Sequence, residues 1–153
     1  MDASSTPVAE LVPHGPDMTL IERLISYDSA RSVAVARIDE GSVFFEHGGV
    51  PAWAGLEYMA QAIAAHAGFA ARLRGERPAV GFLVGTRAYS SFVTHFPAGV
   101  ELTISVEPEI SEGGFASFNC SIETDRVVAT AVVNVYQPST EELARLRSAV
   151  SAP

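Results

Sequence analysis

The longest run of mostly apolar residues in the chain lies between Trp53 and Leu73. This run is rich in alanine, contains no proline, and ends in basic residues followed by Gly75, as helices commonly do. Pro51 suits the opening of a helix, because the first helical N–H groups need no partner within the helix. Since apolar residues lie on nearly every side of this predicted helix, we expect most of its surface to be buried.

The segments after Pro78 alternate between apolar and polar residues or are rich in β-branched residues, and both patterns are typical of strands. We expect strands over residues 32–38, 80–84, 89–95, 101–110, 115–123 and 127–136. Residues 18–27 fit a strand or a short helical turn equally well. Short turn sequences separate the later segments, which indicates an antiparallel meander.

A length of 153 residues suits one domain with one core. We expect residues 1–10 to form a flexible arm, because they lack any periodicity, and residues 11–153 to form the domain. A C-terminal helix is predicted within 138–150, where Ser139 and Glu142 have the spacing of a capping box. One antiparallel sheet wrapped around one long central helix is an α+β architecture. A single small sheet leaves strand edges unpaired, which favours a dimer.

The formal net charge is −8, and all ten basic residues are arginines. Because nucleic-acid binding requires a basic surface, we do not expect a protein with this charge to bind nucleic acid. Its apolar helix contains polar residues unsuited to a membrane span, and the N-terminus lacks a secretory signal pattern, so we expect a cytoplasmic protein. The single cysteine, Cys120, lies in an alternating run and is interpreted as a packing residue. No spacing of histidines or acids predicts a metal site.

Glu57 is the sole acidic residue between His47 and Gly75, and it falls in the first turns of the predicted buried helix. Burial of an unpartnered carboxylate is costly and raises its pKa until the group is neutral. A carboxylic acid kept protonated near neutral pH is a competent general acid. The alternative is a solvent-exposed glutamate stabilised by the helix dipole.

Gln61 lies one turn after Glu57 on the same face of the predicted helix. Its amide has three alternative roles: a hydrogen bond to Glu57, a hydrogen bond to a substrate, or a purely structural bond.

Two of the four histidines, His14 and His47, lie in loops that are able to face Glu57. His66 is nine residues after Glu57, which places it on roughly the opposite side of the helix. We therefore interpret His66 and His95 as packing or surface residues.

The sequence over residues 51–61 resembles the start of the central helix in hot-dog 3-hydroxyacyl-[acyl-carrier-protein] dehydratases. In that family a proline precedes an acid, which is followed by a Met-Ala-Gln-like triplet. Residues 13–22 resemble the Pro-His opening of the same family, and residues 81–99 resemble its following strands. The resemblance covers about residues 11–136 and is nearest to the dehydratases of aryl-polyene biosynthesis.

The resemblance implies a hot-dog fold and dehydration of a 3-hydroxyacyl thioester to the trans-2-enoyl thioester, with Glu57 as acid. Better-known members carry the catalytic histidine at a place that corresponds to Val43 in an ungapped match. The aryl-polyene subgroup points instead to His14 as base, and His47 is the alternative if the loop is shortened. The residues implied to bind substrate are Met18, Trp53, Ala54, Gly55 and Gln61.

The resemblance also implies an acyl carrier protein as partner, with the substrate on its phosphopantetheine and no further cofactor. An arginine cluster at Arg72, Arg74 and Arg77 would dock the carrier, or else is a solvated helix end. Relatives assemble their sites from two subunits, so we expect a homodimer or a hetero-oligomer with another hot-dog or ketosynthase-type subunit. Rival functions are a hot-dog acyl thioesterase, which would use Glu57 to activate water, and a non-catalytic subunit that binds an acyl carrier.

Overall fold

The computed structural model describes residues 2–12, 15–77 and 82–151. The strands are β1 (Arg23–Asp28), β2 (Arg31–Arg37), β3 (Gly49–Pro51), β4 (Phe82–Ser91), β5 (His95–Pro97), β6 (Glu101–Glu112), β7 (Phe115–Glu123) and β8 (Val127–Tyr136). The α-helices are α1 (Gly55–Leu73) and α2 (Thr140–Ser151), and the short 3-10 helices are η1 (Ala3–Ser5), η2 (Val8–Glu10), η3 (Pro16–Met18) and η4 (Ala52–Ala54).

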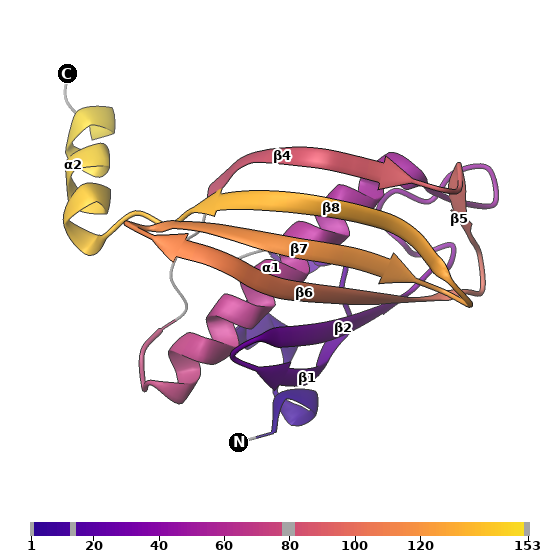
Figure 1. The fold of residues 1–153 in the computed structure, drawn as a ribbon, viewed down its shortest axis with the longest axis horizontal. Helices are drawn as coiled ribbons and strands as arrows, with labels where there is room; N and C mark the ends of the chain where they lie inside the picture. Colours follow the sequence, from indigo (N-terminus) through magenta and orange to yellow (C-terminus); the bar gives the residue numbers. More distant parts are fainter. Residues whose placement is uncertain (1, 13–14, 78–81, 152–153) are drawn as a thin grey trace.

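Within the described residues, six strands form one antiparallel sheet in the order β1-β2-β6-β7-β8-β4, and β3 pairs with β5 in a separate two-stranded ribbon. The sheet curves across the long helix α1 (Figure 1). This arrangement confirms the predicted α+β fold with one sheet around one central helix. Strands β1 and β4 form the two edges of the sheet.

The core lies between α1 and the inner face of the sheet, where α1 contacts β1, β2, β6, β7 and β8. The alanine-rich sequence of α1 keeps the helix thin, so that the strands approach it from several sides. Its largest buried side chains are Tyr58 and Phe69, and the sheet contributes Leu102, Ile104 and Ile122. Burying such side chains is the main favourable contribution to folding.

At Gly68 the N-terminal segment comes very close to α1. A Cβ at this position would lie within 2.9 Å of the carbonyl carbon of Leu11 and closer still to its oxygen. Because these are backbone atoms, they cannot move aside as a flexible side chain would. Glycine at position 68 therefore allows the N-terminal segment to pack directly on the helix.

We expect Gly68→Ala to lower the free energy of unfolding by about 1–2 kcal/mol. Overlap with backbone atoms puts the strain of overpacking in the upper part of its usual range, about 2–3 kcal/mol, which exceeds the gain of about 1 kcal/mol in helix propensity. Chemical denaturation of the two proteins measures the difference. Gly85→Ala is the matched control, since a Cβ there meets nothing within 4 Å. Equal stability of Gly68→Ala and wild type would show that residues 8–12 do not pack on α1 as described.

The N-terminal segment differs from the expected flexible arm over residues 1–10. This segment contains η1 and η2, joined by residues 6–7, and Ala3, Thr6 and Val8 are buried. Asp2 caps η1 by accepting a hydrogen bond from the Ser4 N–H at 3.1 Å. These residues pack on the core, a tertiary contact that local periodicity does not predict.

Two predicted strands, 80–84 and 89–95, also differ from the structure, and residues 80–81 lie outside the described part. Strand β4 continues across Gly85, where the register against β8 shifts by one residue. The strand ends at Ser91, whose side chain bonds the backbone of Val93 and turns the chain toward β5. A bulge thus carries the strand through the expected break, and a side-chain turn ends it early.

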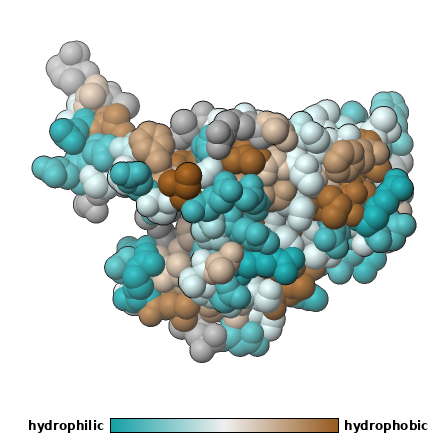
Figure 2. All heavy atoms as spheres, viewed as in Figure 1, coloured by the Kyte–Doolittle hydropathy of each residue, from teal (hydrophilic) through white to brown (hydrophobic). Residues whose placement is uncertain are grey.

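The C-terminal helix follows the predicted capping box. The Glu142 N–H donates to Ser139 Oγ at 3.1 Å, and the Glu142 carboxylate reaches back to the Ser139 N–H at 3.5 Å. Tyr136 also hydrogen-bonds the Glu142 carboxylate. Helix α2 projects from the end of the sheet (Figure 1). Figure 2 shows separate apolar patches on this face, one beside the base of α2 and one at the opposite end of the sheet.

Candidate active site

The start of α1 is held by residues of β4 and by the segment leading into β5. The Ala52 N–H donates to the Thr94 carbonyl at 2.9 Å, and the Tyr89 hydroxyl donates to the Ala52 carbonyl. Gly55 leaves room for this tyrosine, because a Cβ there would overlap its hydroxyl. These contacts fix where the helix begins relative to the sheet.

No side-chain oxygen caps this helix start from the N-cap positions, which are Pro51 for η4 and Ala54 for α1. The first N–H groups of a helix lack partners within the helix, and its N-terminus carries a partial positive charge. Such a helix end polarises a carbonyl or stabilises a developing negative charge. Ala54 and Gly55, two residues implied to bind substrate, are buried here.

Glu57 lies in the first turn of α1 and is half-buried, with fully buried Tyr58 and Met59 next to it. The structure therefore places the predicted acid beside the positive end of the helix. A carboxyl group in this position can exchange a proton with a group bound at the helix N-terminus.

Gln61 is completely buried one turn further along α1. Its Nε2 donates to the Met18 carbonyl and its Oε1 accepts from the Leu20 N–H, both at 2.7 Å. Of the three alternatives left open by the sequence, the structure shows a bond to the backbone of a distant segment. The resemblance implied that Gln61 contacts the substrate. In the structure, both polar atoms of its side-chain amide are bonded to the backbone instead.

Met18 and Trp53, the other two residues implied to bind substrate, are exposed in the single chain. The Trp53 side chain is 64% exposed, although its ring makes an edge-to-face contact with Phe44 at a centroid distance of 5.2 Å. Single exposed apolar side chains are common on protein surfaces, so their exposure alone does not establish a substrate-binding role.

The histidines occupy contrasting places. His14 lies outside the described residues. His47 is exposed at the tip of a tight turn with φ 50°, which is closed by two backbone hydrogen bonds between Glu46 and Gly49. His95 is exposed on β5. His66 is buried in the core, as expected for a packing residue.

The surroundings of His66 explain how the core holds an imidazole. Its Nδ1 lies 2.6 Å from Ser32 Oγ, and its ring packs against Tyr27 and Phe118. Burial lowers the pKa of His66 below its usual value of 6.5, and the nearby charge of Asp28 opposes this in part. The folded chain therefore favours the neutral imidazole.

This lowered pKa predicts a pH dependence of stability. Below pH 6.5 the unfolded chain binds a proton at His66 that the folded chain takes up only at lower pH, so stability falls as the pH drops through this range. Replacing His66 by Gln removes this contribution. We expect unfolding free energies measured between pH 5 and 8 to fall less steeply toward acid in the variant. Parallel curves would contradict a depressed pKa at this site.

The predicted docking arginines lie at and just beyond the end of α1, and two of them are already paired. Arg72 forms an ion pair with Glu10 at 2.5 Å, and Arg74 pairs with Glu76 at 3.2 Å. Arg77 is exposed. A carrier protein docking here would have to displace two carboxylates of this chain.

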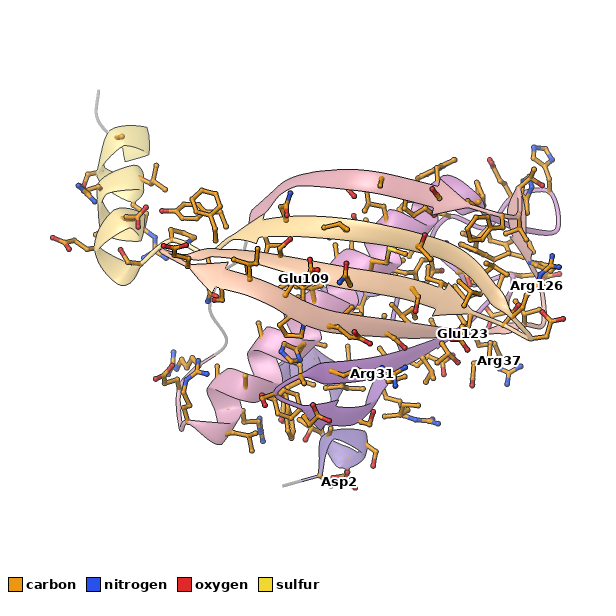
Figure 3. All side chains as sticks on the ribbon, viewed as in Figure 1. Asp2, Arg31, Arg37, Glu109, Glu123 and Arg126 are labelled. Carbon is orange, nitrogen blue, oxygen red and sulfur yellow. The ribbon has the colours of Figure 1, made fainter. Side chains whose placement is uncertain are left out.

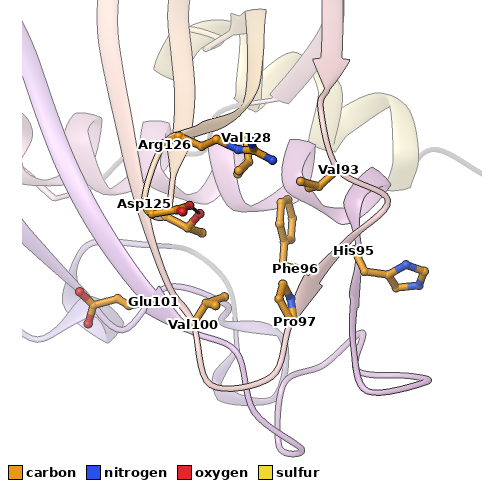
Figure 4. A pocket seen from close by; sticks show the side chains of 10 residues that line it. Val93, His95, Phe96, Pro97, Val100, Glu101, Asp125, Arg126 and Val128 are labelled. Atoms are coloured by element: carbon orange, nitrogen blue, oxygen red, sulfur yellow. Dashed lines mark hydrogen bonds between the residues drawn. The ribbon is translucent and has the colours of Figure 1, made fainter.

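An open cleft of about 660 Å³ lies at one end of the sheet (Figure 4). Valines and the ring of Phe96 line its apolar part, and His95, Glu101, Asp125 and Arg126 surround it. Arg37 and Glu123 lie at the same end of the sheet as Arg126 (Figure 3). The mixed charges around this cleft give it no strong preference for an anion or a cation.

Other candidate chemistry is weak within the described residues. Burial raises the pKa of the Cys120 thiol to about 12, which makes it a poor nucleophile. No group of three metal-ligating side chains occurs among the residues described. In the same part of the chain, neither helix combines the length and apolar character needed to cross a membrane.

Comparison with known proteins identifies the family. The ApeP-like family, described as ApeP dehydratase, matches residues 6–147. A chain of the dehydratase heterocomplex ApeI:P from Xenorhabdus doucetiae is 31% identical, with a TM-score of 0.85 over 92% of this chain and 97% of that chain. No curated protein sequence matches the chain.

More distant structures share the fold. A hypothetical thioesterase with coenzyme A from Streptococcus pneumoniae TIGR4 is 14% identical, with a TM-score of 0.58 over 76% of this chain and 84% of its own. The PaaI protein of the E. coli phenylacetic acid degradation operon is 13% identical, with a TM-score of 0.60 over 76% of this chain and 78% of its own. Identities this low support the hot-dog fold alone. Because the family match spans almost the whole chain, this protein belongs to the ApeP-like dehydratases, the aryl-polyene dehydratases that its sequence resembles.

Proposed function

We propose that this dehydratase removes water from a 3-hydroxyacyl thioester carried on an acyl carrier protein and leaves the trans-2-enoyl thioester. The observation that carries the proposal is the half-buried Glu57 in the first turn of α1, at a helix start without a side-chain cap. A thioester carbonyl bound at this helix end would be polarised by the backbone N–H groups of Trp53 and Ala54, since the Gly55 N–H already donates to the Ala52 carbonyl.

Polarisation of the carbonyl acidifies the neighbouring carbon 2. His14 removes a proton from carbon 2, and the electron pair of that C–H bond forms the new double bond to carbon 3. The bond from carbon 3 to its hydroxyl breaks, and Glu57 protonates the departing oxygen, so that water leaves. A proton then passes back from the imidazolium to the carboxylate through solvent. The substrate is carried on the phosphopantetheine of the carrier protein, and the reaction as proposed needs no metal and no redox cofactor.

We also propose that the chain acts in a complex with a second subunit of the hot-dog fold. The relative from Xenorhabdus doucetiae is part of a heterocomplex. In this chain β4 is an edge strand that pairs only with β8 among the described strands, so its other edge is open to a strand of a second subunit. Such a subunit would bury part of the exposed side chains of Trp53 and Met18. A homodimer is the alternative assembly.

The test is incubation of the protein, alone and with a hot-dog partner subunit, with a 3-hydroxyacyl-carrier thioester, followed by the intact mass of the carrier. We expect the acyl carrier to lose one water and keep its acyl group. Release of free acid would instead indicate a thioesterase. The thioesterase among the distant structural neighbours shares only the fold with this chain. Binding without any change of mass, in every combination, would indicate a non-catalytic subunit.

A further inference from the structure

Gln61 joins α1 to a segment far away in the sequence. Its amide group donates to the Met18 carbonyl and accepts from the Leu20 N–H, each at 2.7 Å. One side chain thus satisfies two backbone groups of residues 18–20, as a neighbouring strand would. Because Gln61 has no exposed surface, water cannot replace either bond without opening the core.

The same segment is folded onto itself toward Gly15. The Gly15 carbonyl accepts hydrogen bonds from the Met18 N–H and from Thr19 Oγ1, both at 3.0 Å. On the other side, Leu20 and Ile21 are buried in the core. Residues 15–20 therefore form a compact turn, and Gln61 fastens that turn to α1.

We propose that Gln61 is a positioning residue for the dehydration, which rests on the proposed roles of Glu57 as acid and His14 as base. Glu57 precedes Gln61 by one helical turn, about 6 Å along the axis. His14 is bonded covalently to Gly15, at the near end of the fastened turn. Gln61 thereby holds Gly15, the chain neighbour of the proposed base, relative to the helix that carries the proposed acid, without itself contacting the substrate.

Two substitutions separate this role from a general structural one. Gln61→Met keeps a similar shape and removes both hydrogen bonds at every pH. In Gln61→Glu, a protonated carboxyl group can still donate to the Met18 carbonyl and accept from Leu20, whereas the ionised form loses the donor and faces that carbonyl with a negative charge. Activity of Gln61→Glu should therefore recover as the pH is lowered.

In the active complex we expect Gln61→Met to lower kcat by about 10- to 100-fold with little change in KM, because a displacement near 1 Å can cost this much. Relative to wild type at the same pH, Gln61→Glu should regain activity toward acid and Gln61→Met should not. Hydrogen exchange of the Leu20 N–H supplies a readout independent of turnover. Exchange should be faster in Gln61→Met at every pH, and in Gln61→Glu at a pH high enough to ionise the introduced carboxyl group.

Faster exchange at Leu20 with unchanged kcat would overturn the positioning role, because the turn would then be loose without effect on the reaction. A raised KM with unchanged kcat would overturn it in favour of substrate binding. Unchanged exchange would refute the fastening itself. A wild-type complex that performs no dehydration would overturn the proposed function and the positioning role with it, while the exchange result would still decide whether Gln61 fastens the turn.

Discussion

Replacing Glu57 by glutamine is expected to slow dehydration by at least about 100-fold, the lower end of what a general acid contributes. Glutamine has nearly the same shape and keeps the first turn of α1, but it cannot protonate the departing 3-hydroxyl. Binding of the 3-hydroxyacyl carrier should change little. The loss should therefore fall on kcat, measured from the mass of the carrier-bound acyl group over time.

Glu109→Gln is a suitable control, because Glu109 is an exposed glutamate on strand β6, far from Glu57 in the sequence. It removes the same charge and should keep full activity. Thermal unfolding of both variants should match wild type closely enough to exclude misfolding. Full activity of Glu57→Gln in a folded complex would rule out Glu57 as the acid.

Replacing His14 by alanine should cause a loss of similar size, whereas His47→Ala should retain activity. A general base accounts for a factor of about 100 or more in rate. The exposed place of His47 at the tip of a turn makes it the weaker candidate. The same assay of kcat decides between the two histidines.

The opposite pattern, with activity lost in His47→Ala and kept in His14→Ala, would assign the base to His47. Activity kept in both variants would refute a histidine base from either loop. Because the side chain of His47 is exposed, its replacement should leave the packing of the core intact.

The central architecture could be predicted from the sequence because it depends on local periodicity. The unbroken alanine-rich run between Trp53 and Leu73 predicted α1, and alternation predicted β6, β7 and β8 to within a few residues. The position of Glu57 at the start of the buried helix followed from the same pattern. A capping box at Ser139 likewise predicted the start of α2.

The features that could not be predicted depend on contacts between distant segments. The two hydrogen bonds of Gln61 join residues more than 40 positions apart in the sequence. The sequence of the helix alone therefore could not decide the role of Gln61. The packing of Ala3 and Val8, and the ion pair of Arg72 with Glu10, likewise exist only once the N-terminal segment lies against the core. A polar residue in an otherwise apolar helix is nevertheless a signal that a buried partner exists.

The most direct test of the account is an experimental structure of the Glu57→Gln complex with a 3-hydroxyacyl-pantetheine substrate bound. The account predicts the thioester carbonyl at the N-terminus of α1, and the 3-hydroxyl within hydrogen-bond distance of residue 57, about 3 Å. It also predicts an imidazole facing carbon 2. A substrate bound elsewhere, with residue 57 pointing into bulk water, would contradict it.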